Sequence, residues 1–403
     1  MTDYSRHLSV LLVLLTVSYA GAQESMDLRQ AIQIASENNP RMQVFRKNKA
    51  VSDAEVAVAR EFSNPSLIGE TTRSQPNYFA GAGYTFELGG KRGKRIDIAL
   101  SAAEVAQLDY RSGLLALRHD VRASFFSLLF SRSRQQEAAA SRDMAQRLLD
   151  ISQQRFEAGD APRLEALTAQ LALKQRENEL KQADAEEKAA QLQLNSLLNR
   201  EPMQELQLKG SLEDPSHAPP LDTLVAQAMQ QHVDVQSLQQ QIKGEETRLS
   251  LAHAGRIPDL EAEGGTEIHD ADFQYGWRAA LRFELPLLNQ KDGEIQRSTA
   301  ALEALQAQMQ VAIQRIRTDI SAAYLKYESA SFQTDNYRKE ILPETAELET
   351  LAEESYKDGR TGILGVLEAQ RAARQVRLDY LDALLQYQTA IADLELASGV
   401  DLP

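Results

Sequence analysis

The chain has 403 residues, contains no cysteine and carries a formal net charge of -14 at pH 7. The lack of cysteine excludes disulfides, thiolate chemistry and a lipidated N-terminal cysteine, so we expect any membrane attachment to come from the fold itself. The acidic balance argues against nucleic acid or another polyanion as a partner.

The first residues have the pattern of a secretory signal. A short, mostly apolar run over residues 10–17 leads to Ala20-Gly21-Ala22, an A-x-A-like cleavage site. We therefore expect residues 1–22 to be a signal peptide and the mature chain to begin near Gln23. No later stretch reaches the roughly 18 to 20 uninterrupted apolar residues that a transmembrane helix needs, so a membrane role would have to depend on strands.

The rest of the chain is a duplication. When one half is shifted by about 200 residues, the later parts of the two halves align with constant spacing. The matched pairs include Leu148 with Leu348, Gly159 with Gly359, Leu164 with Leu364, Leu167 with Leu367 and Gln175 with Gln375. We predict a first repeat over residues 23–200, a proline-rich linker over 201–220 and a second repeat over 221–403.

Each repeat has the same expected order of elements: a helix, two strands, a very long helix, a turn and a further helix. The expected helices cover residues 28–62, 94–158 and 163–199 in the first repeat and 221–256, 293–358 and 362–398 in the second. The expected β-hairpins cover residues 65–88 and 258–285. At a rise of about 1.5 Å per residue, the long helix of each repeat extends for about 100 Å.

Apolar residues recur every three or four positions along both long helices, which is the spacing of a helix that packs against its neighbours. They are Leu114, Leu117, Val121, Phe125 and Leu128 in the first helix and Leu302, Leu305, Met309, Ile313, Ile316 and Ile320 in the second. We therefore expect an extended helical wall. A soluble coiled-coil scaffold would contain the same helices and stays open as an alternative.

Between the helices, the periodicity changes to strict alternation, which indicates strands with different surroundings on their two faces. We assign the apolar face to lipid, through Tyr84, Phe86, Tyr275, Trp277, Leu281 and Phe283. We assign the charged face to a water-filled lumen, through Glu261, Glu263, Glu267, Arg278, Arg282 and Glu284. This pattern is typical of transmembrane β-barrels. For each strand alone, an amphipathic hairpin that covers a soluble core is the alternative.

Four strands cannot close a barrel, and open strand edges are not tolerated in lipid. The strand count therefore predicts that several copies of the chain contribute to one pore. The expected fold class is mainly α with a small β part, built from a duplicated unit of helix, β-hairpin, long helix and helix.

The turns between the helices have the sequences RFEAG at 155–159 and YKDG at 356–359, and each leads into a leucine-rich helix start. Together with the duplicated order of elements, these motifs resemble the TolC-like outer membrane efflux factors over essentially the whole mature chain. The segment FELGGKRGKR at 86–95 is similar to the cobalt-zinc-cadmium (CzcC-type) heavy-metal efflux subgroup.

The resemblance implies a homotrimer whose twelve-stranded transmembrane β-barrel, embedded in outer-membrane lipid, continues into a periplasmic α-helical barrel. It also implies a passive exit duct rather than an enzyme. Such a duct works with a periplasmic adaptor (membrane fusion protein) and an inner-membrane RND-type transporter. The subgroup implies heavy-metal cations as substrates, with organic compounds such as drugs as the alternative.

The two helical turns are the best candidate sites, because a tunnel mouth needs a contact surface and a constriction that can open. Gly159 and Gly359 suit the left-handed position after a helix end. The predicted adaptor-docking residues are Gly159, Asp160, Arg163, Leu164, Leu167, Gly359, Arg360, Leu364 and Leu367, and the predicted gate includes Asp358 or Glu165. The alternative is that these residues only form tight turns.

No other residue set points to a chemical site. His269, Asp270 and Asp272 share a loop, but the chain has no H-x-x-H or H-E-x-x-H spacing, so we expect no metal site. It also has no G-x-S-x-G motif or glycine-rich phosphate loop, so we expect no catalytic residue and no cofactor. The basic run 91–95 suits either contact with anionic headgroups or a solvated connector. A periplasmic adaptor also contains long helical hairpins and stays open as a further alternative.

Overall fold

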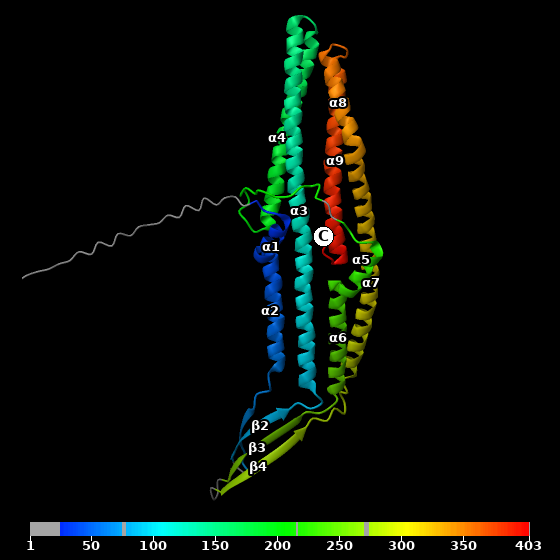
Figure 1. Ribbon diagram of the computed structural model, residues 1–403. Helices are drawn as coiled ribbons and strands as arrows, with labels where there is room; N and C mark the ends of the chain where they lie inside the picture. Colours follow the sequence, from blue (N-terminus) through cyan, green and yellow to red (C-terminus); the bar gives the residue numbers. More distant parts are fainter. Residues whose placement is uncertain (1–24, 75–77, 215–216, 270–273, 403) are drawn as a thin grey trace, which may run out of the picture.

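The computed structural model describes residues 25–74, 78–214, 217–269 and 274–402, so the predicted signal segment 1–22 lies outside the described residues. Figure 1 shows an elongated molecule in which the helices run side by side along one axis. A small sheet lies at one end, and two turns between helices lie at the other. We call the end with these two turns the tip.

The first repeat contains α1 (Leu28–Asn38), α2 (Pro40–Arg60), β1 (Ser66–Thr71), β2 (Tyr78–Phe86), α3 (Lys91–Ala158) and α4 (Arg163–Leu197). The second contains α5 (Leu221–Gln231), α6 (Val233–Ala254), β3 (Leu260–His269), β4 (Gln274–Phe283), α7 (Asp292–Asn336), the π-helical turn η1 (Tyr337–Ile341), α8 (Leu342–Lys357) and α9 (Ile363–Ser398). The same order occurs twice, and the prediction of a mainly α chain with a small β part is confirmed.

Both helices that precede the hairpins are broken. α1 ends before Asn39 and α2 begins at Pro40, because proline has no N–H to donate and disfavours helical backbone at the residue before it. His232 separates α5 from α6, and its backbone is extended like that of Asn39. The prediction of one continuous helix over 28–62, and of another over 221–256, is therefore wrong.

The second long helix is also interrupted, whereas α3 is a single α-helix of 68 residues. The turn η1 separates α7 from α8 and stands just before Pro343. In a regular α-helix the proline ring would clash with the carbonyl of Lys339, four residues earlier, and the backbone widens over that segment. The expected uninterrupted rod over 293–358 is corrected accordingly.

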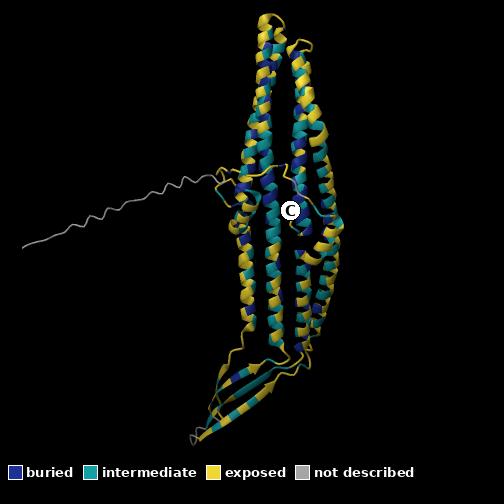
Figure 2. Ribbon diagram, in the orientation of Figure 1, coloured by how far each residue is buried: buried dark blue, intermediate teal, exposed yellow. Residues whose placement is uncertain are grey.

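One part of the core lies between α3 and the helices on either side of it, and another lies between α5, α6, α7 and α9. Near the sheet, α3 packs between α2 and α6, and toward the tip it packs between α4 and α9. The predicted contact residues Val121, Phe125 and Leu128 are almost completely buried, and they pack with Leu194 of α4. Figure 2 shows buried residues gathered around the middle of the molecule. In α7 only the later predicted positions, Ile316 among them, are buried, while the earlier ones are half-buried.

The four strands form one antiparallel sheet in the order β1-β2-β3-β4. β2 pairs with β3, from Tyr78 opposite Ile268 to Phe86 opposite Leu260, so the sheet joins the two repeats. β1 and β4 are its edges. No helix within the described ranges is both long enough and apolar enough to cross a membrane.

Candidate functional site

The charged residues of β3 and β4 lie on one face of the sheet. Glu261 stands opposite Arg282, and Gly265 stands opposite Arg278. The guanidinium of Arg282 donates from Nη1 to Glu261 Oε2 and to Glu263 Oε1, each at 2.9 Å. The structure thus brings together five of the six predicted lumen residues, counting Glu267, and leaves out Glu284, which lies beyond the end of β4.

Arg278 shows how this face is shaped. Its Nη2 donates to Glu70 Oε2 at 2.9 Å, although Glu70 lies on β1, at the opposite edge of the sheet. Its Nε lies 3.7 Å from Glu267 Oε1. An arginine can reach across two intervening strands only if its side of the sheet is concave, so the charged face is the inside of the curl.

A buried aromatic ring on the same face was not foreseen from the sequence. Phe79 of β2 is 5% exposed, and the Arg278 guanidinium carbon lies 3.6 Å from its ring centre. The ring occupies a notch made by Gly81 and Gly265, because a Cβ at either position would come within 2.8 Å of a ring atom. Gly81 stands directly opposite Gly265 in the register of β2 and β3, and the glycines of both strands were the sequence signal for such a notch.

The opposite, convex face carries the six residues predicted to face lipid. Trp277 is 83% exposed, and Tyr275, Leu281 and Phe283 are also exposed. On β2, Phe86 is exposed, and its ring packs edge-to-face on that of Tyr84 at 4.8 Å. Large apolar side chains on the outside of a curved sheet need an apolar environment or a partner surface.

At the tip, both turns end their helices in the same way. Gly159 and Gly359 have φ angles of 82° and 72°, so each adopts the left-handed conformation predicted for it. The next N–H in each turn donates back across the helix end, from Asp160 to the Arg155 carbonyl and from Arg360 to the Ser355 carbonyl, both at 2.8 Å.

The leucines after the two turns are not equivalent. Leu164, Leu167 and Leu364 are exposed, whereas Leu367 is half-buried against the apolar cluster of the tip. The charged docking candidates are exposed as well, namely Asp160, Arg163, Asp358 and Arg360, and the last two form an ion pair at 2.7 Å.

Tyr356 connects the two turns, and the sequence did not single it out. It is completely buried, and its hydroxyl donates to Glu165 Oε2 at 3.1 Å. Arg155 Nη1 donates to the Tyr356 carbonyl at 3.3 Å, and the Arg155 guanidinium lies 4.8 Å from the ring centre. Burial, together with the neighbouring Glu165 carboxylate, raises the pKa of Tyr356, so the donor keeps its proton at neutral pH. The predicted gate residue Glu165 thus joins the first repeat to the second.

The basic run 91–95 joins the sheet to the helices. Lys91 Nζ lies 2.9 Å from Asp259 Oδ1, and Arg95 Nη1 lies 2.7 Å from Glu87 Oε1. Arg92 stacks on the Phe62 ring at 3.9 Å. Two of the four basic residues are therefore neutralised within the chain, which leaves less charge for headgroups than the sequence suggested.

No group of three His, Asp or Glu side chains among the described residues is arranged to hold a metal ion. Of the loop residues considered from the sequence, Asp270 and Asp272 lie outside the described ranges.

Comparison with known proteins gives consistent matches. Residues 31–200 and 224–400 match a family described as outer membrane efflux protein. The chain is 26% identical over 378 residues to the cobalt-zinc-cadmium resistance protein CzcC of Cupriavidus metallidurans, covering 91% of this chain and 88% of the relative. The CmeC outer membrane channel of Campylobacter jejuni superimposes with a TM-score of 0.77 at 15% identity, covering 92% of this chain and 85% of CmeC. CusC, which forms a transmembrane channel, superimposes with a TM-score of 0.78 at 16% identity, covering 92% and 91%.

Proposed function

Because the chain belongs to the outer membrane efflux protein family, whose members are passive channels, we propose that it is the exit duct for heavy-metal cations in a tripartite RND-type system. The resistance protein CzcC, matched over nearly the whole chain, is the observation that favours metal cations over organic compounds. The sheet lies at the outer membrane, and the helices extend into the periplasm. On the same grounds, we propose that residues 1–22 form the signal peptide, with repeats over 23–200 and 221–403 and a linker between them.

A homotrimer accounts for the free edges of the sheet. The four strands described in each chain leave β1 and β4 at the edges of the sheet, and three copies pairing β4 with β1 would give a closed barrel. The helical wall has matching edges at α2 and α7. Exposed apolar residues recur on these edges at multiples of seven residues. On α2 they are Val44, Val51 and Val58, and on α7 they are Val311, Leu325 and Phe332, with Thr318 between the first two. This spacing suits a seam with a neighbouring copy.

The concave face suits a cation path. In each chain, the carboxylates of Glu70, Glu261, Glu263 and Glu267 outnumber the guanidinium groups of Arg278 and Arg282 on that face. A lumen with an acidic excess attracts cations without holding them, and weak interaction is what passage requires. The convex face, with Tyr84, Phe86, Tyr275, Trp277, Leu281 and Phe283, would then contact lipid.

The tip is the proposed docking surface for a periplasmic adaptor. Leu164, Leu167 and Leu364 offer apolar contacts to a helical hairpin, and Arg163 and Arg360 are exposed in the same two turns. Leu367 instead supports the tip from within. A charge-reversal variant, Arg360→Glu, should reduce copurification of the adaptor and leave trimer formation intact. Unchanged copurification and efflux would remove Arg360 from the docking surface.

Two measurements test the function. The protein extracted from outer membranes in mild detergent should have the mass of three chains, each of 44.8 kDa before signal removal. A deletion strain should gain sensitivity to cobalt, zinc or cadmium and recover with the intact gene. Sensitivity to organic compounds alone would replace the metal assignment, and a water-soluble monomer would overturn the channel assignment in favour of an adaptor or scaffold.

A further inference from the structure

The two helix breaks, one in each repeat, are held by the same pair of hydrogen bonds. In the first repeat, Asn39 Oδ1 accepts from the Arg41 N–H at 2.9 Å, and Nδ2 donates to the Leu197 carbonyl at 2.8 Å. In the second, His232 Nδ1 accepts from the Asp234 N–H at 3.2 Å, and the ring also hydrogen-bonds the backbone of Ala397. Each residue thus caps the next helix and ties it to the end of the last helix of its own repeat.

Backbone and burial are also the same at the two breaks. Asn39 has φ -63° and ψ 128°, and His232 has φ -63° and ψ 129°. Both side chains are almost fully buried. The two sites therefore differ mainly in chemistry, because an amide does not titrate near neutral pH and an imidazole does.

The proton would enter at the atom that caps the helix. Nδ1 of His232 accepts a hydrogen bond, so in the neutral ring the proton lies on Nε2, the nitrogen left to donate to the Ala397 carbonyl. Protonation of Nδ1 turns that acceptor into a donor. The Asp234 N–H at the start of α6 then loses its partner.

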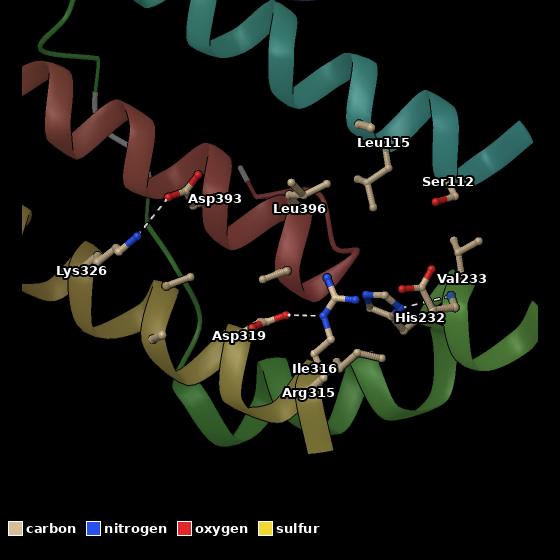
Figure 3. Close-up of a pocket in the computed structure, with 15 residues that line it drawn as sticks. Ser112, Leu115, His232, Val233, Arg315, Ile316, Asp319, Lys326, Asp393 and Leu396 are labelled. Carbon is tan, nitrogen blue, oxygen red and sulfur yellow. Dashed lines mark hydrogen bonds and ion pairs between the residues drawn. The ribbon is translucent and has the colours of Figure 1, made fainter. Parts of the chain in front are cut away.

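Water can reach this place. His232 lines a cavity of about 420 Å³ between α3, the α5–α6 break, α7 and α9 (Figure 3). The charged groups that line it are Asp234 of α6, Arg315, Asp319 and Lys326 of α7 and Asp393 of α9. From α3, Ser112, Leu115 and Ala116 line the cavity, and two titratable α3 groups contact or face the lining carboxylates. Burial and the nearby Asp234 carboxylate raise the pKa of Asp109, and His119 Nε2 lies 3.1 Å from Asp393 Oδ1. Arg315 pairs with Asp319 at 3.3 Å and Lys326 with Asp393 at 3.6 Å, so both cations and two of the three carboxylates are already engaged.

We propose that His232 is a pH-sensitive clamp that releases the start of α6 when its ring is protonated, whereas Asn39 holds the matching break in the first repeat at any pH. Acidification would then loosen one repeat and not the other, at the junction of α5 and α6, in the half of the helices nearer the sheet (Figure 1). The clamp is independent of what the channel exports.

The direction of the effect follows from linkage. Burial lowers the pKa of His232 below its ordinary value of 6.5, and Arg315 adds to this, although Asp234, the Ala397 hydrogen bond and Asp319 oppose it. A lowered pKa means that the clamped state prefers the neutral ring. The clamp is at full strength above pH 6.5 and weakens as pH falls toward the lowered value, by about tenfold per pH unit for one proton.

Hydrogen exchange measured by mass spectrometry on the detergent-solubilised protein tests the clamp, with rates corrected for intrinsic exchange at each pH. Peptides across the α5–α6 break should lose protection as pH falls from 7.5 to about 5, by up to about tenfold per unit below pH 6.5. Peptides across the α1–α2 break of the same molecule are the internal control and should not change.

His232→Asn, which copies the first repeat, should remove the pH dependence, with His232→Gln as a second variant. Asn39→His should create it at the first break. Equal pH dependence at the two breaks, or its persistence in His232→Asn, would overturn the proposal.

Discussion

Replacing Tyr356 with phenylalanine removes one hydroxyl from the tip and leaves the buried ring in place. The lost interaction is the 3.1 Å hydrogen bond to Glu165, which joins the turn of the second repeat to the first turn of α4. Hydrogen bonds to charged groups contribute about 1.5–3 kcal/mol, and because Glu165 is half-exposed we take about 1 kcal/mol. A loss of about 1 kcal/mol corresponds to about a fivefold increase in the population of molecules whose two tip turns have separated. The contacts of the ring with Arg155 and the apolar cluster remain.

Planar-bilayer conductance and hydrogen exchange of the 350–362 peptide report this separation. Tyr356→Phe should increase both, and adding Glu165→Gln should change little more, because the two substitutions remove the same interaction. Tyr380→Phe is the matched control, since the Tyr380 hydroxyl donates to Glu213 at 2.8 Å away from the tip. If Tyr356→Phe exchanges like the unmodified protein, or if the effects of the two tip substitutions simply add, then the hydrogen bond between Tyr356 and Glu165 does not hold the two turns of the tip together.

Three further substitutions test the sheet and the core. Gly265→Ala would place a Cβ 2.3 Å from the Ala80 carbonyl and should destabilise the folded protein by about 1–3 kcal/mol, as measured by thermal unfolding. Gly264→Ala is the control, because a Cβ there meets nothing within 4 Å and should leave thermal unfolding unchanged. Arg278→Gln should shift bilayer reversal potentials toward greater cation selectivity, and an unchanged potential would place Arg278 outside the conducting path. Leu128→Ala empties a fully buried position and should cost about 2–5 kcal/mol in denaturant unfolding.

Features that depend on local periodicity could be predicted from the sequence. The two glycine turns, the repeated order of elements and the two faces of β4 all follow from spacing within one segment. The break at Asn39 has a local signal in the proline that follows it, Pro40, whereas the break at His232 has no such signal. Each break is also held by a hydrogen bond to the end of a helix more than 150 residues later in the chain, at Leu197 and Ala397, which local periodicity does not predict.

In the candidate sites as well, local periodicity predicted some features, and contacts between distant segments determine the others. Alternation assigned Arg278 to the charged face, but its ion pair with Glu70 exists only because the sheet curls. The burial of Phe79 likewise needs the glycines of two strands side by side. At the tip, Leu167 and Leu367 occupy matching positions in the two repeats, yet only Leu367 packs against the apolar cluster. Packing between the repeats decides that difference.

The two repeats differ at the places where a conformational change would act. Tyr356 is buried and bonded across the tip, whereas Phe156 at the matching position of the first repeat is exposed. The second long helix contains a π turn before Pro343, while α3 passes the matching position, Asp143, as unbroken α-helix. A helix that already lacks regular hydrogen bonds at one point bends there at lower cost than a continuous helix. We infer that the first repeat is the more rigid of the two, and that any movement of the second would act at Tyr356, at the turn before Pro343 and at His232.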